Sequence, residues 1–83
     1  TDTPCTPTFE LEVRDRILAQ DGVMRLDTLR TRKFGNKVYV DAEIAVDGQL
    51  RLVDAHAIAE RAHDAVEQSF PTVKHIMIHE NPA

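Results

Sequence analysis

Apolar side chains recur at the spacing of a helix face in two stretches of the chain and at strand spacing in three others. Helices are predicted over residues 8–20 and 52–69. The apolar stripe of the first comprises Phe9, Leu11, Val13, Ile17 and Leu18. The stripe of the second comprises Leu52, Ala55, Ala59, Ala62, Val66 and Phe70. Each helix is therefore expected to turn one face to a core and the other to water.

Strands are predicted over residues 23–32, 37–46 and 73–80, where apolar and polar positions alternate. In the middle strand the inward set is Val38, Val40, Ala42 and Ile44, and the outward set is Tyr39, Asp41 and Glu43. In the last strand Ile76 and Ile78 alternate with His75, Met77 and His79. Gly35 and Asn36 are expected to supply the positive φ angles of a tight hairpin between the first two strands.

Capping and stop residues are consistent with these boundaries. Thr6 or Thr8 can cap the first helix, and Pro7 suits its first turn. Gly22 is predicted to stop that helix, and Pro71 the second. Residues 1–7 are predicted to be an extended leader, with the ordered domain over residues 8–83. The order α-β-β-α-β predicts a two-layer α+β sandwich with helices on one sheet face and the other face free.

Composition narrows the function classes. A chain of 83 residues buries a small core, so a partner subunit or a bound ion is expected to stabilise it. The net charge of −4 argues against a nucleic-acid partner, and the basic run at residues 30–33 is interpreted as a solvated strand end. Cys5 stands alone, which indicates a reducing compartment and excludes paired-thiolate chemistry. No stretch is long and apolar enough to span a membrane.

Catalytic motifs are absent, and the chain is predicted not to be an enzyme. Ser69 is the only serine and has no base nearby in the sequence. The glycines form no phosphate-binding loop. Because the chain begins at Thr1, it is expected to be a piece of a longer protein.

Metal-ligating side chains gather on the predicted free face. Asp41 and Glu43 emerge together from one strand, and their mutual repulsion favours a nearby cation. His75 and His79 share a face of the last strand. Imidazole and carboxylate ligands suit Zn(II), Mn(II), Fe(II) or Co(II) better than Cu(I). The alternative is that these four residues are only the hydrated side of a half-buried sheet.

The second helix carries a polar stripe of His56, Glu60, His63 and Glu67. This stripe contains no His-Glu-x-x-His motif, so a metallohydrolase is not supported. It is either a solvated helix flank or an additional source of imidazole ligands.

Several segments together resemble the cytoplasmic domain of the cation diffusion facilitator family. They are Gly22-Val23, Asp27-Thr28-Leu29-Arg30-Thr31-Arg32 with Gly35, Val46-Asp47, Leu52-Val53-Asp54-Ala55-His56-Ala57-Ile58-Ala59, Phe70-Pro71, and Ile76-Met77-Ile78-His79-Glu80-Asn81-Pro82. Their order and spacing cover almost the whole chain. Asp2 matches the acidic residue at the junction with the membrane part.

The resemblance implies a ferredoxin-like (metallochaperone-like) fold and a homodimer on the cytoplasmic side of a membrane. Residues 1–7 would then be the linker from a transmembrane part of the same chain. The whole protein would be a metal/proton antiporter, with Zn(II) the first choice of metal and Mn(II), Fe(II) or Co(II) the alternatives.

The resemblance also implies a ligand set. His79 stands at the family's last-strand ligand, His56 at its helix ligand, and Asp41 or Glu43 at its strand ligand. Asp27 replaces a family histidine and can still bind a cation. Further candidates are His75, His63 and Asn81, the last of which replaces a family carboxylate.

Three functions remain open on the sequence. The first is a metal-responsive regulatory domain in which cations favour a closed dimer. The second is a constitutive dimerisation scaffold with no physiological metal site. The third is a free-standing ferredoxin-like binding module.

Overall fold

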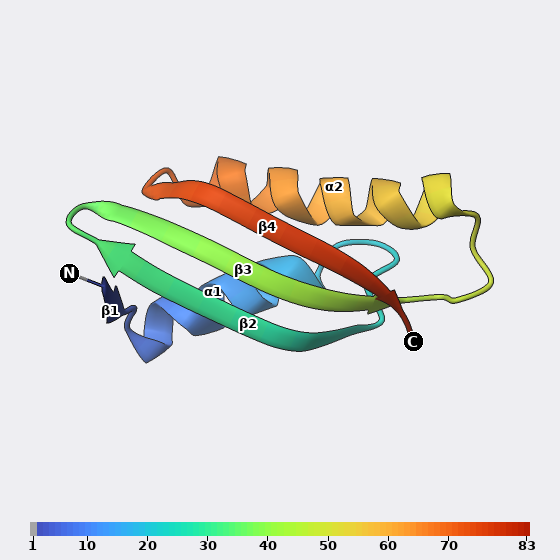
Figure 1. The fold of residues 1–83 in the computed structure, drawn as a ribbon, viewed down its shortest axis with the longest axis horizontal. Helices are drawn as coiled ribbons and strands as arrows, with labels where there is room; N and C mark the ends of the chain where they lie inside the picture. The colour runs from blue at the N-terminus through green and yellow to red at the C-terminus, as the bar shows by residue number, and fades with distance from the viewer. Residues whose placement is uncertain (1) are drawn as a thin grey trace.

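The computed structural model describes residues 2–83 as one sheet with two helices (Figure 1). The elements are β1 (Asp2–Pro4), α1 (Pro7–Leu18), β2 (Arg25–Phe34), β3 (Lys37–Val46), α2 (Leu52–Ser69) and β4 (Val73–Pro82). The strands are ordered β1-β2-β3-β4 across the sheet. Strand β2 is antiparallel to both β1 and β3, and β4 runs parallel to β3. The predicted α+β sandwich and its α-β-β-α-β order are confirmed, with β1 as an addition.

Strand β1 lies within residues 1–7, the segment that the sequence predicts to be an extended leader. Thr3 pairs with Lys33 and Pro4 with Arg32, so the segment extends the sheet by one short edge strand. A proline lacks the amide hydrogen that a central strand needs, but an edge strand tolerates it. The three residues of β1 show no alternation of apolar and polar side chains, so the sequence pattern could not reveal this strand.

Helix α1 begins where its capping residues predict. Thr6 is the N-cap, and its Oγ1 accepts a hydrogen bond of 3.2 Å from the amide of Phe9. The helix ends at Leu18, earlier than predicted, with Ala19 as its C-cap. Gly22 therefore does not stop the helix. It lies in the following turn at φ +95°, where a Cβ would come within 2.6 Å of Ile58 on α2.

The core lies between the helices and the helix-covered face of the sheet. It comprises Val13, Ile17, Val38, Val40, Ala42, Ile44, Val46, Ile58, Ala59, Ala62, Val66 and Val73. The inward set predicted for β3 is fully confirmed. Two stripe predictions are wrong, because Leu11 is 58% exposed and Leu52 is 81% exposed. Leu52 is the first residue of α2, one turn before Ala55, where packing against the core begins.

Two irregularities in β2 and its hairpin decide which side chains reach the free face. The β2–β3 register shifts between Leu26 and Thr28, so Asp27 is an extra residue in a β-bulge. At the hairpin only Gly35 has a positive φ among the described residues, and the expectation for Asn36 is wrong.

Neither helix within residues 2–83 is long and apolar enough to cross a lipid bilayer.

Candidate metal-binding site

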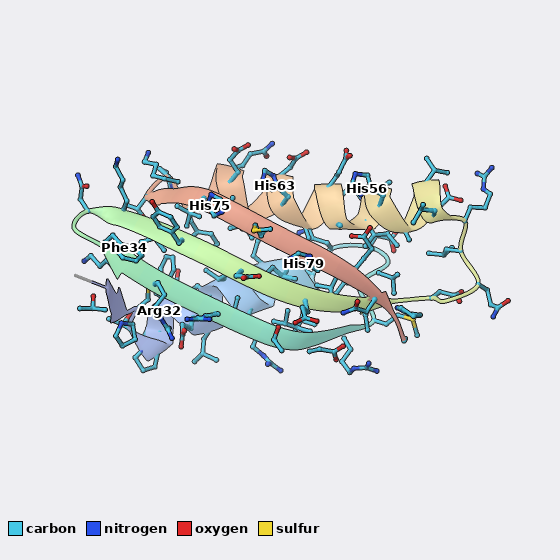
Figure 2. All side chains as sticks on the ribbon, in the orientation of Figure 1. Arg32, Phe34, His56, His63, His75 and His79 are labelled. Carbon is cyan, nitrogen blue, oxygen red and sulfur yellow. The ribbon has the colours of Figure 1, made fainter. Side chains whose placement is uncertain are left out.

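The sheet face that no helix covers carries an imidazole beside a carboxylate. The register pairs Glu43 on β3 with His79 on β4. Two residues earlier on each strand, it pairs Asp41 with Met77. Nε2 of His79 lies 3.9 Å from Oδ1 of Asp41. Both side chains are about half exposed, at 53% and 57%. Figure 2 shows His79 on β4, at the front of the sheet. The alternation of β3 and β4 therefore brings these predicted ligands together.

Glu43 is the carboxylate that the protein itself holds in place. Nδ2 of Asn81 donates a hydrogen bond of 3.0 Å to its Oε1. Oγ1 of Thr28 donates a longer one, of 3.4 Å, to its Oε2. Asn81 thus lies beside the predicted site, but its amide serves as a donor to a neighbouring carboxylate. Asn81 is among the candidates named from the sequence. Thr28 is not, because the bulge that brings it opposite Glu43 has no clear sequence signal.

His75 lies on the same face but in an aromatic row. It pairs with Tyr39, and the two rings are 5.3 Å apart between centroids. Tyr39 in turn contacts Phe34, with centroids 5.1 Å apart and the rings edge to face. The labels in Figure 2 place His75 near the start of β4 and His79 farther along. His75 therefore packs with aromatic rings, at the pair of positions next to Asp41 and Met77 on this face.

His56 on α2 is engaged by carboxylates outside the sheet face. Its Nε2 lies 3.0 Å from Glu60, and its Nδ1 lies 3.5 Å from Glu80 on β4. A groove of about 250 Å³ runs between α2 and β4 and is lined in part by His56, His63 and His79. His79 thus belongs both to the sheet face and to the rim of this groove. The described contacts join His56 to Glu60 and Glu80, not to Asp41 or Glu43.

His63, one of the additional candidates, lies two turns farther along α2. Its Nδ1 is 3.3 Å from Oδ1 of Asp64. Within residues 2–83, His63, Asp64 and Glu67 offer ligand atoms that all lie within 4.8 Å of one another. The stripe predicted from the sequence contained His63 and Glu67 but missed Asp64. Asp64 directly follows His63 and so lies outside a stripe of three- and four-residue spacing. Its side chain nevertheless turns toward the His63 ring.

Asp27 lies apart from the Asp41–His79 pair because the bulge removes it from the strand pairing. It forms an ion pair with Arg25. The hydrogen bond from that guanidinium lowers the pKa of the Asp27 carboxyl below its ordinary value, against a smaller opposing effect of desolvation. The same contact raises the pKa of Arg25. Thr28, not Asp27, faces Glu43.

The side chain of Asp2 lies outside the described part of the structure, so its predicted junction role stays a prediction.

The donor set on the sheet face fits a borderline divalent cation. Zn–N and Zn–O bonds of about 2.1 Å at tetrahedral angles separate two ligand atoms by about 3.4 Å. The 3.9 Å between His79 and Asp41 is close to that separation, and both exposed side chains have room to approach. Glu43 adds a second carboxylate from the same strand. One face of a single chain therefore supplies an incomplete coordination shell, open toward solvent or a second copy.

Comparison with known families agrees with the fold. Residues 6–83 match the family described as cation efflux protein, cytoplasmic domain. The chain belongs to this family, the cytoplasmic domain of the cation diffusion facilitators.

Among curated relatives, the manganese efflux system protein MneP of Bacillus subtilis is 30% identical over 71 residues, covering 86% of this chain. Metal tolerance protein C1 of Arabidopsis thaliana is 33% identical over 78 residues, covering 93%. The chain spans only 24% and 17% of the lengths of these two proteins.

Solved structures share the ferredoxin-like fold. A variant of the MamM C-terminal domain in a manganese form superposes with a TM-score of 0.87 at 21% identity, covering 92% of this chain and 96% of that one. Another MamM C-terminal domain gives a TM-score of 0.79 at 25% identity, with 88% and 98% covered. The ferredoxin-like architecture expected from the sequence is confirmed.

Proposed function

We propose that this chain is the cytosolic regulatory and dimerisation domain of a divalent-metal/proton antiporter, and that it binds Zn(II)-type cations to favour a closed homodimer. The observation that carries the proposal is the 3.9 Å approach of His79 to Asp41 on an uncovered sheet face. Family membership supports the cytoplasmic placement, because the matching family is the cytoplasmic domain of cation efflux proteins.

A second copy of the chain completes the proposed site. Each sheet face offers one imidazole and two carboxylates, which leaves coordination positions open. A cation that accepts ligands from both copies binds the closed dimer more tightly than an open one and shifts the population toward it. Moving the balance from 1:99 to 99:1 requires a preference of about 5.5 kcal/mol for the closed form. Several imidazole and carboxylate ligands from two copies can supply a preference of this size.

The protein's own hydrogen bonds prepare the face for this role. Asn81 and Thr28 orient Glu43 through both of its carboxylate oxygens. Imidazole ligands bind a cation only in their neutral form, so the metal affinity of such a site falls as the pH is lowered. Zn(II) is the first choice because it accepts mixed nitrogen and oxygen ligands. Mn(II), Fe(II) and Co(II) remain alternatives, and one relative is named as a manganese efflux protein.

Titration of the chain with Zn(II) at pH 7 tests the proposal. The melting temperature should rise, and small-angle scattering should show a more compact dimer. His79→Ala and Asp41→Ala should each blunt both effects. Glu12→Ala, which removes an exposed carboxylate from α1, should leave them unchanged. An unchanged melting temperature on adding metal to the parent chain would overturn the proposal.

A constitutive dimerisation scaffold is the second candidate. The observation that favours it is that several predicted ligands already have protein partners. Glu43 is held by Asn81 and Thr28, and His56 lies against Glu60. In this case the dimer would form equally well with and without metal. Equilibrium dialysis at micromolar zinc, combined with sedimentation, separates the two candidates: a dimer that retains no zinc supports the scaffold.

A further inference from the structure

We propose that α2 carries a second divalent-cation site, formed by His63, Asp64 and Glu67 and separate from the Asp41–His79 pair on the sheet face. One ligand atom from each of the three side chains lies within 4.8 Å of the others. Figure 2 shows His63 on α2 and His79 on β4, so the two sites are carried by different elements. This inference goes beyond the proposed regulatory function and does not depend on it.

Helical geometry accounts for the convergence of the three side chains. Residues 63 and 67 are four apart and therefore neighbours on one helix face. Asp64 joins them by turning toward its neighbour, with its Oδ1 3.3 Å from Nδ1 of His63. That distance is close to the separation of about 3.4 Å between two ligands of a tetrahedral Zn(II). The imidazole favours Zn(II) or Co(II) over Ca(II) or Mg(II), which take oxygen ligands.

The charge distribution of α2 gives an independent reason for a cation here. The carbonyl end of a helix carries partial negative charge, which destabilises nearby anionic side chains. Glu67 lies in the last turn of a helix that stops at Ser69, and this turn has no basic residue. Among the ion pairs of the described residues, neither the Asp64 nor the Glu67 carboxylate meets a lysine or arginine. A divalent cation would compensate the two carboxylates and the helix end together.

The imidazole is also held in place. The side chain of His63 is 39% exposed, against 63% for Asp64, and it lines the groove between α2 and β4 beside Met77. A half-buried ring loses less rotamer freedom on binding a cation than an exposed one does. Three protein ligands leave the remaining coordination positions to water, which is the arrangement of an exchangeable site.

Zinc binding to a variant that lacks three of the other predicted ligands tests the site. The background is Asp41→Ala, His56→Ala and His79→Ala, three substitutions at side chains that are more than half exposed. Circular dichroism first checks that this background is folded. Isothermal titration with Zn(II) should then show one residual equivalent per chain, and the NMR signals of the His63 ring should shift on binding. Adding His63→Ala should weaken this binding at least about tenfold, the low end of the loss when even a supporting residue of a metal ligand is removed.

Charge-matched variants separate coordination from general electrostatics. Glu67→Gln and Asp64→Asn should each weaken the residual binding, whereas Glu12→Gln on α1 should not. The helix site is overturned if the background binds no zinc, or if His63→Ala leaves the residual affinity unchanged. Neither result bears on the sheet-face site. That site is tested separately by zinc-induced compaction of the dimer, measured in the His63→Ala chain with Asp41 and His79 intact.

Discussion

The side-chain amide of Asn81 on β4 donates a hydrogen bond of 3.0 Å to Oε1 of Glu43 on β3. The contact joins two parallel strands at the sheet face where the predicted metal ligands lie. It neutralises no charge, but it orients a carboxylate beside the Asp41–His79 pair. A carboxylate at position 81 would have the opposite effect without metal, because it would face Glu43 with like charge.

Replacing Asn81 by aspartate should therefore exchange metal-free stability for metal affinity. Asn81→Asp loses a hydrogen bond worth about 1 kcal/mol and adds repulsion. With Zn(II), the added carboxylate should give a larger rise in melting temperature than the parent chain shows. Thermal melts with and without zinc measure both effects, and Asn36→Asp in the hairpin is the matched control. Equal zinc-induced rises in the parent and the Asn81→Asp chain would contradict the expectation.

The buried hydroxyl of Thr31 should matter more than its position in a basic run suggests. Thr31 is fully buried and donates a hydrogen bond of 2.6 Å to Oε2 of Glu10 on α1. Thr31 is the buried exception in the run of residues 30–33, whose basic side chains are exposed or half-buried near the end of β2, as predicted. Thr31→Val keeps the shape but leaves Glu10 without its donor, so unfolding in urea should show a loss of about 1–3 kcal/mol. Thr8→Val, at an exposed position of α1, should change stability by less than about 0.5 kcal/mol.

Gly22→Ala should destabilise the chain more than Gly35→Ala. Both glycines have positive φ, at +95° and +59°. A Cβ at position 22 would lie 2.6 Å from Cδ1 of Ile58, whereas one at position 35 meets nothing within 4 Å. Gly35→Ala should cost about 1–2 kcal/mol from backbone strain alone, and Gly22→Ala should exceed it. Adding Ile58→Val to Gly22→Ala should recover part of the difference in denaturant melts. Equal costs for the two glycines would show that the contact with Ile58 is relaxed without penalty.

The ion pair of Asp27 with Arg25 should give a pH-dependent contribution to stability. The pKa of Asp27 is lowered in the folded chain, first by its hydrogen bond from Arg25. Its contribution is therefore fully present above the unfolded pKa of about 3.9 and is lost as the pH falls through the lower folded value. Asp27→Asn should lower the melting temperature slightly at pH 7, and the difference should vanish in acid. Asp15→Asn on α1 is the control. A difference that persists at pH 2 would point to a cause other than ionisation.

Periodic segments allowed prediction to the residue. Strand β3 and helix α2 have the bounds that alternation and helical spacing indicate, namely Lys37–Val46 and Leu52–Ser69. A strand with one buried face must place every second side chain in the core, so its pattern determines both its type and its orientation. The same parity places Asp41 and His79 on the free face. Leu52 shows the limit of periodicity, because it has the right angle on the helix but lies beyond the covered core.

The sequence alone therefore determined the two layers, the free face and the residue types that it presents, because period and polarity are local properties of the chain. Tertiary structure decided which of those residues meet. The pairing of β1 with β2, the bulge that removes Asp27 from the row, and the hydrogen bonds of Asn81 and Thr28 to Glu43 each join segments that are distant in sequence. No local pattern encodes these contacts, because strand register and side-chain packing are set by the partners that the folded chain brings together.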